Sequence, residues 1–164
     1  MSSLNNKGKY FILSVLIVFA DLYTKNLANS YLEFAQPVKV TNFFNLTLLY
    51  NHGAAFSILS NDQTSWQMIM FSIISFVAAI VLIFLIIKQP ADDKINLFSF
   101  ALVLGGDLGN FYDRAFRGYV VDFLDFHVGN YHWPAFNIAD SAITCGIVIL
   151  IIFSFFNKKS KKSS

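Results

Sequence analysis

Two carboxylates in the last third of the chain have surroundings that favour aspartyl chemistry. Asp122 lies in the apolar, strand-like run VVDF at 120–123, where removal from water is expected to raise its pKa. Asp140 stands three residues after Asn137, which suits Asn137 as a helix N-cap and puts Asp140 at the third helical position, where the helix dipole favours a negative charge. Two close carboxylates of this kind share one proton, so one acts as a base on water and the other as an acid toward a carbonyl. The pattern therefore predicts peptide hydrolysis by an Asp122–Asp140 pair.

Spacing alone also allows a plainer interpretation, in which Asp140 only caps a helix and Asp122 is a solvated loop residue. A third carboxylate, Asp125, points away from Asp122 at strand period, and we predict that it is solvated. No serine–histidine pair stands out, so a serine or cysteine hydrolase has little support. The histidines lack the spacing of metal ligands, so no metal site is predicted; they are His52, His127 and His132.

The composition indicates that these residues belong to a membrane protein. The chain has 164 residues, of which 55% are hydrophobic and 13% charged, and 19 of them are phenylalanine. A soluble domain of this size needs more polar surface. The length suits a single membrane-embedded domain over residues 1–164. The net charge of +2 is too small to indicate nucleic-acid binding, and the one cysteine, Cys145, has no partner for an intramolecular disulfide.

Four apolar segments have the length of membrane-spanning helices, about 17–25 residues. They are expected at about 10–28, 66–87, 95–111 and 138–156. The first could be taken for a cleaved signal peptide, but Asp21 and Lys25 interrupt it and no A-x-A-like site follows, which favours a retained helix.

The basic residues predict the orientation of these helices, since cytoplasmic loops are enriched in lysine and arginine. Eight of them flank one end of the bundle: Lys7, Lys9, Lys88, Lys94, Lys158, Lys159, Lys161 and Lys162. The other loops carry only Lys39, Arg114 and Arg117. Both termini and the loop at 88–94 are therefore expected in the cytoplasm, and loops 29–65 and 112–137 outside.

This orientation places the polar residues of the helices at one depth, near the outer interface. They are Asp21, Lys25, Gln67, Asp107, Asn110 and Asp140. A charged side chain inside a membrane is costly and usually marks function. The outer loops alternate apolar and polar residues at 38–41 and 45–48, and 119–126 is rich in β-branched and aromatic residues, so a small β element is predicted over the helix ends.

Two features of the helices have structural explanations. Asp21 and Lys25 are spaced i, i+4, which predicts a self-neutralising pair with a structural or supporting role, although a fixed charge lining a site or meeting a lipid head group is also possible. Gly105 and Gly106 allow close approach to a neighbouring helix. Arg114 is expected to pair with a carboxylate or a phosphate.

Five motifs, in this order and at this spacing, resemble the lipoprotein signal peptidases (signal peptidase II) of bacteria over nearly the whole chain. They are DLYTK at 21–25, NHGAAF at 51–56, GGDLGNFYDR at 105–114, GYVVDF at 118–123 and FNIADS at 136–141. The resemblance implies four transmembrane helices with cytoplasmic ends and an outward β-cradle. It also implies an intramembrane aspartyl protease of the bacterial plasma (inner) membrane, with Asp122 and Asp140 as its dyad near the outer (periplasmic) leaflet.

The same resemblance implies a substrate and a set of supporting residues. Its substrate is a prolipoprotein whose lipobox cysteine carries a diacylglyceryl group, and cleavage falls just before that cysteine. It implies no metal and no cofactor, and it implies inhibition by globomycin. The positions that line or support the site are Asn51, Gly53, Asn110, Arg114, Asn137 and Ala139.

Asp107 departs from the family pattern, which usually has a small residue there. It is expected to pair with Lys25 or Arg114, to raise the pKa of the dyad, or to reduce activity. Two other functions therefore stay open: a small proton-conducting protein with a relay of Asp21, Asp107 and Asp140, and a catalytically impaired lipoprotein-binding homologue. A presenilin-like or prepilin-peptidase-like protease has less support, because Leu104 stands at the first glycine of the Gly-x-Gly-Asp motif.

Overall fold

Four long helices and a small antiparallel sheet make up the structure, a computed structural model that describes residues 7–52 and 65–160. The helices are α2 (Gly8–Tyr31), α3 (Ser65–Lys88), α4 (Lys94–Tyr112) and α5 (Ile138–Ser160), and α4 continues into a short π-helix, η2 (Asp113–Arg117). Each coincides with an expected apolar segment and extends beyond it. Gly53, which the resemblance places at the site, lies outside the described residues.

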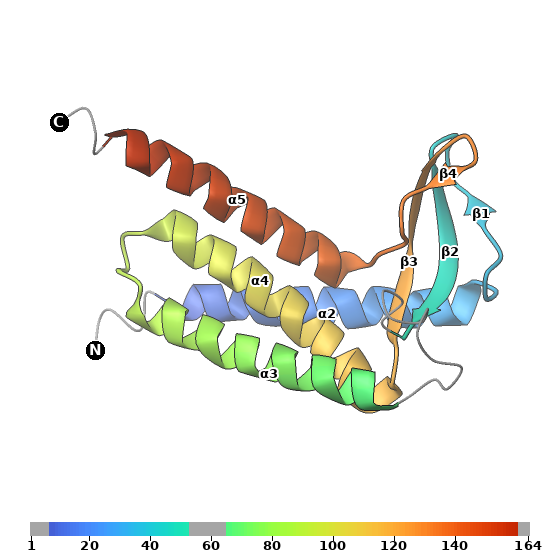
Figure 1. Ribbon diagram of the computed structural model, residues 1–164, viewed down its shortest axis with the longest axis horizontal. Helices are drawn as coiled ribbons and strands as arrows, with labels where there is room; N and C mark the ends of the chain where they lie inside the picture. Colours follow the sequence, from blue (N-terminus) through green and yellow to red (C-terminus); the bar gives the residue numbers. More distant parts are fainter. Residues whose placement is uncertain (1–6, 53–64, 161–164) are drawn as a thin grey trace.

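The helices lie alongside one another, and the sheet stands at one end of the bundle, while the start of α2 and the end of α5 are at the other end (Figure 1). Helix α4 is central and contacts α2, α3 and α5. Away from the sheet the bundle is held by an apolar core that includes Tyr10, Ile86, Leu97 and Leu104. This core fills the half of the bundle in which a proton relay would need polar groups.

Three of the helices are long and apolar enough to cross a membrane: Gly8–Tyr31, Trp66–Lys88 and Ile138–Phe156. Their outward faces carry large exposed apolar side chains such as Phe19, Phe84 and Ile152. Such a surface suits contact with lipid rather than water. The chain is therefore a multi-pass membrane protein.

Helix α4 is not apolar enough to be counted with these three, so the prediction of four membrane-spanning helices is confirmed only in part. Its 19 residues include Asp107, Asn110 and three glycines, which lower its hydropathy. This composition follows from its central position, because a helix covered by three neighbours presents polar groups to protein and not to lipid chains.

The sheet contains four strands in sequence order: β1 (Val38–Lys39), β2 (Phe44–Asn51), β3 (Val120–Val128) and β4 (Tyr131–His132). All neighbouring strands are antiparallel, and Leu49 pairs with Asp122 across β2 and β3. The predicted β element is therefore present. Its buried side chains, Leu48, Val121 and Phe123, pack with Ala28 of α2 and fix the sheet against the helix ends.

Candidate active site

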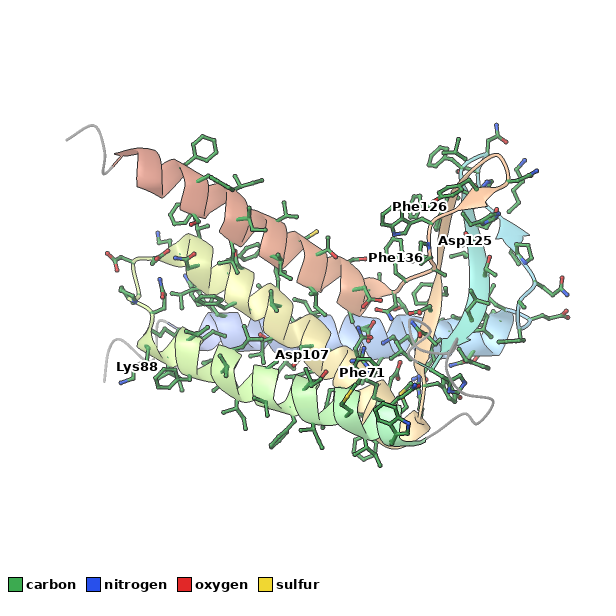
Figure 2. The ribbon with its side chains drawn as sticks, viewed as in Figure 1. Phe71, Lys88, Asp107, Asp125, Phe126 and Phe136 are labelled. Carbon is green, nitrogen blue, oxygen red and sulfur yellow. The ribbon has the colours of Figure 1, made fainter. Side chains whose placement is uncertain are left out.

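A short backbone pairing brings the two predicted carboxylates together. Phe136, just before α5, pairs with Leu124 of β3: Leu124 N–H donates to Phe136 O at 2.8 Å, and Phe136 N–H donates to Leu124 O at 3.1 Å. The ring of Phe136 also stacks on that of Phe126, with the ring centroids 5.8 Å apart, and the two lie beside the sheet in Figure 2. The first turn of α5, with Asp140, is thereby held beside the strand that carries Asp122.

Asn137 and Asp140 cap the start of α5 reciprocally. The side-chain oxygen of Asn137 accepts from Asp140 N–H at 3.0 Å, and Asp140 Oδ2 accepts from Asn137 N–H at 3.3 Å. This is a capping box with aspartate in place of the usual glutamate, and it satisfies two backbone N–H groups that the helix cannot. The predicted N-cap is therefore confirmed.

Asn137 also bonds the other carboxylate, so one residue holds both, Asp140 through its backbone N–H and Asp122 through its side chain. Its amide nitrogen donates to Asp122 Oδ1 at 2.8 Å, and Asn51 of β2 donates to Asp122 Oδ2 at 3.1 Å. Asp122 is only 3% exposed. Burial is the main cause that raises its pKa, and the negative charge of Asp140 raises it further. The pKa reaches about 7 although the hydrogen bonds from Asn51 and Asn137 lower it. Its carboxyl group is thus poised to exchange a proton near neutral pH.

Asn110 of α4 connects this pair to a buried lysine. Its side-chain oxygen accepts from Lys25 Nζ at 3.0 Å and from Asn137 Nδ2 at 3.2 Å, while its own amide nitrogen donates to Asp140 Oδ1 at 2.7 Å. Because a lysine ammonium only donates, the oxygen of Asn110 must face Lys25, and its N–H group must then face Asp140. The lysine therefore sets the direction in which the amide acts.

Lys25 is completely buried and forms the centre of a charge cluster behind the two aspartates. Its Nζ forms ion pairs with Asp21 Oδ2 at 2.7 Å and with Asp113 Oδ2 at 3.0 Å, and Arg117 Nη1 forms one with Asp113 Oδ1 at 3.0 Å. Two acids and two bases balance, which makes burial of the charges tolerable. The predicted Asp21–Lys25 pair is present.

The acids of this cluster also bond the backbone beside each aspartate. Asp21 Oδ1 accepts from Ala139 N–H at 2.9 Å, next to Asp140, and Asp113 Oδ2 accepts from Val121 N–H at 3.1 Å, next to Asp122. The sequence reasoning gave Asp113 and Arg117 no part in this. Their i, i+4 spacing directly after an apolar helix was the available signal.

Residues 13–156 match the family model described as signal peptidase (SPase) II. The chain belongs to the signal peptidase II family.

Individual members of the signal peptidase II family match along most of their length. The lipoprotein signal peptidase of Francisella tularensis subsp. novicida is 79% identical over 97% of this chain and 99% of its own, and that of Acinetobacter baylyi is 46% identical over 91% and 83%. A solved bacterial membrane enzyme superposes with a TM-score of 0.82 at 33% identity, covering 96% of this chain and 93% of its own. Another superposes with a TM-score of 0.78 at 35% identity, over 88% and 91%. Members of this family are aspartic peptidases.

Tight packing at two glycines positions the first turn of α5 in this family member. A side chain at Gly106 would overlap the backbone oxygen of Ala139, and one at Gly109 would lie 2.6 Å from Asp21 Oδ2. Helix α4 can therefore approach the segment that carries Asp140 only because these positions lack a Cβ atom.

The prediction that Asp125 is solvated is wrong. Asp125 is only 5% exposed and accepts hydrogen bonds from His132 at 2.7 Å, Thr47 at 2.9 Å and Asn45 at 3.4 Å. It does point away from Asp122, but side chains of the neighbouring strands β2 and β4 flank it there, and reasoning from the β3 segment alone could not include them. Burial tends to raise the pKa of Asp125, and the bonds from these three side chains outweigh it and lower the pKa.

Asp107 meets partners on α3 and η2. Its carboxylate accepts a hydrogen bond from Ser75 of α3 and interacts with Arg114, not with Lys25. The charged and polar groups that act on Asp122 do not include it. Of its two candidate partners, Arg114 is therefore the one with which Asp107 interacts, and the effect of Asp107 on activity stays a prediction.

An apolar groove of about 690 Å³ runs between α3 and η2. Arg114 lines it, and its Nη1 donates to the Ser75 hydroxyl at 3.3 Å. The groove reaches His52, adjacent to Asn51, and Gly118, near the start of β3. In the part of the chain that the structure describes, no three His, Cys, Asp or Glu side chains are grouped to hold a metal ion.

Proposed function

We propose that Asp122 and Asp140 are the catalytic dyad with which this signal peptidase II family member hydrolyses diacylglyceryl-modified prolipoproteins just before the lipidated cysteine. The carrying observation is that one residue, Asn137, donates to both carboxylates: its backbone N–H to Asp140 Oδ2 and its side-chain amide to Asp122 Oδ1. The raised pKa of Asp122, about 7, supports a dyad that holds one proton at neutral pH.

In this mechanism Asp122 carries the shared proton and Asp140 is the base. Two N–H groups, of Asn110 and Asn137, and the start of α5 accommodate the negative charge of Asp140. Asp140 takes a proton from water, the water oxygen bonds to the scissile carbonyl carbon, and Asp122 gives its proton to the carbonyl oxygen. The resulting diol collapses as Asp140 passes its proton to the amide nitrogen and Asp122 recovers a proton from a diol hydroxyl.

The carbon–nitrogen bond then breaks and both aspartates return to their starting states. The products are a signal peptide with a new carboxyl group and a lipidated cysteine with a free amine. Asn51, Asn110, Asn137 and Ala139 support the dyad through their hydrogen bonds, and the cluster of Asp21 and Lys25 holds these supports in place. The family resemblance extends a site role to Gly53.

The proposed location is the bacterial plasma (inner) membrane, with the sheet and dyad at the outer leaflet and both termini in the cytoplasm. The distribution of basic residues supports this orientation, and Lys88 lies at the end of the bundle away from the sheet (Figure 2). Helix α4 serves as the fourth span, because its 19 residues reach about 28 Å at 1.5 Å per residue, close to the thickness of a bilayer core. Membrane lipids and globomycin-type inhibitors are the further expected partners.

The test is a gel-shift cleavage assay with a diacylglyceryl-modified prolipoprotein. Asp122→Asn and Asp140→Asn are each expected to reduce kcat by about a thousandfold or more, since each removes one of two proton-transfer groups. Asp92→Asn is the matched control, because Asp92 is exposed in the loop at the opposite end of the bundle. Full cleavage by either dyad variant would refute the assignment.

A further inference from the structure

Asp107 is a carboxylate inside the helix bundle that the proposed mechanism does not use. It lies on the side of α4 that faces α3, near Phe71 (Figure 2). One oxygen, Oδ2, is buried and accepts no hydrogen bond. A buried charged oxygen without a hydrogen bond is costly, so its presence calls for a compensating interaction.

The compensating interaction is with Arg114, and Ser75 of α3 connects the two side chains. The Ser75 hydroxyl donates to Asp107 and accepts from Arg114 Nη1 at 3.3 Å, so it links the two charged groups. The hydroxyl has one donor and two acceptor sites, which allows both bonds at once. The guanidinium of Arg114 also lies 5.8 Å from the ring centroid of Phe71, within range of a cation–π contact. Arg114 therefore has three partners: the Ser75 hydroxyl, the ring of Phe71 and the negative charge of Asp107.

Arg114 is placed so that its charge can act on a lipid bound in the groove. Arg114 lines the groove of about 690 Å³, whose other walls are largely apolar, with Met68, Ile73, Phe76 and Phe111 among them. An arginine at the edge of an apolar groove in a bilayer is well suited to bind a lipid phosphate, which it contacts through parallel N–H groups. Asp107 supplies the opposite charge close by and would repel that phosphate.

Two kinds of lipid compete for such a groove. The lipid on the proposed substrate is a diacylglyceryl group, which has two acyl chains and no charge. Anionic phospholipids have the same two chains and a phosphate, and they surround the protein in the membrane. Apolar contacts cannot tell these lipids apart, so only the charge of the groove can.

We propose that Asp107 is a specificity-determining residue that balances the charge of Arg114 and so favours the neutral diacylglyceryl group over anionic phospholipids in the groove between α3 and η2. The proposal rests on the proposed function, which supplies a lipidated substrate.

The kinetic test uses the full-length protein in nanodiscs in which phosphatidylglycerol progressively replaces phosphatidylcholine. For Asp107→Asn and Asp107→Ala, the KM for the prolipoprotein is expected to rise by about tenfold with increasing phosphatidylglycerol, the equivalent of one lost charge interaction, while kcat changes less. Asp107→Glu is expected to restore the wild-type lipid dependence. Asp92→Asn, which removes a charge far from the groove, is expected to behave as wild type. Equal lipid dependence of wild type and Asp107→Asn would overturn the proposal.

A second measurement does not depend on catalysis. In the Asp122→Asn background, spin-labelled phosphatidylglycerol and phosphatidylcholine report which lipid the protein immobilises. Adding Asp107→Asn is expected to create a preference for phosphatidylglycerol, and adding Arg114→Gln as well is expected to remove it. A preference that survives the loss of Arg114 contradicts the proposal. If the wild type cleaves no prolipoprotein but the preference follows this pattern, the proposed function fails and the charge balance at Asp107 stands.

Discussion

Asp122 and Asp125 lie three residues apart on the same strand, are 3% and 5% exposed, and differ in their proton chemistry. The pKa of Asp122 is raised to about 7, and that of Asp125 is lowered. Asp122 meets a second carboxylate and two amides, whereas Asp125 meets an imidazole, a hydroxyl and an amide. Their exposed fractions are similar, but Asp122 lies deeper: burial is the main reason that its pKa is raised, whereas at Asp125 the hydrogen bonds outweigh the effect of burial. A carboxylate surrounded by donors is structural, and one that faces another carboxylate can exchange a proton.

Outside the dyad itself, the largest expected effect comes from removing the side chain of Asn137, which donates to Asp122. Asn137→Ala removes the side-chain hydrogen bond to Asp122 and the oxygen that caps α5, so the first turn of α5, which carries Asp140, is held less firmly beside Asp122. We expect kcat to fall by about a hundredfold, as for a misplacement of about 1 Å in an active site. The lost cap should lower stability by about 1 kcal/mol. Cleavage assays and thermal unfolding in detergent measure the two effects.

Asn137→Ser separates these two contributions. Serine can cap a helix, but it is too short to reach Asp122, so stability should recover while kcat stays low. Asn29→Ala is the control for loss of an amide, because Asn29 is exposed on α2 and bonds only the Tyr50 hydroxyl among the contacts found for its side chain. Recovery of kcat in Asn137→Ser would show that the bridge between the aspartates has no role in catalysis.

A smaller effect is expected from moving Asp140 without changing any polar group. In Gly106→Ala the new methyl group overlaps the backbone oxygen of Ala139, so the start of α5 must shift, and Asp140 shifts with it. We expect kcat to fall by about tenfold and the free energy of unfolding by about 1–3 kcal/mol, as for overpacking. The Asp125 site is on the far side of the strand and should stay intact.

Gly8→Ala is the matched control, since a Cβ atom at this helical position has nothing within 4 Å. Alanine there should leave kcat unchanged and stabilise the helix slightly. If Gly106→Ala behaved like Gly8→Ala, the close approach of α4 would not be what holds Asp140.

The sequence allowed prediction of the parts of this site that depend on local spacing. The N-cap at Asn137, the Asp21–Lys25 pair and the helices follow from periods within one segment, and these are present. The burial of Asp125 and the part played by Asp113 depend on partners from other strands and helices, which no period within one segment reveals. The sequence also could not show which partner Asp107 meets, because both candidates, Lys25 and Arg114, are positively charged.

The smallest effect, on stability, tests the comparison of the two aspartates most directly. The pKa of Asp122 rises from 3.8 to about 7 on folding, so between about pH 4 and 7 the folded state binds more protons than the unfolded state, and Asp122 costs stability increasingly as pH rises. The pKa of Asp125 falls on folding, so this residue contributes stability above about pH 4 and loses it as pH falls through the folded pKa. The two substitutions should therefore change stability in opposite directions at pH 7.

Measured as Tm in detergent at a fixed scan rate, Asp122→Asn should gain on the wild type by several degrees as pH rises from 4 to 7. Asp125→Asn should be less stable than the wild type at pH 7, and the deficit should shrink as the pH falls below about 4. Asp92→Asn corrects for the loss of a surface carboxylate. Because the dyad titrates as a pair, Asp140→Asn should weaken the pH dependence that Asp122 contributes. If Asp122→Asn and Asp125→Asn instead differed from the wild type with the same sign at pH 7, partners would not be what separates a catalytic from a structural carboxylate on this strand.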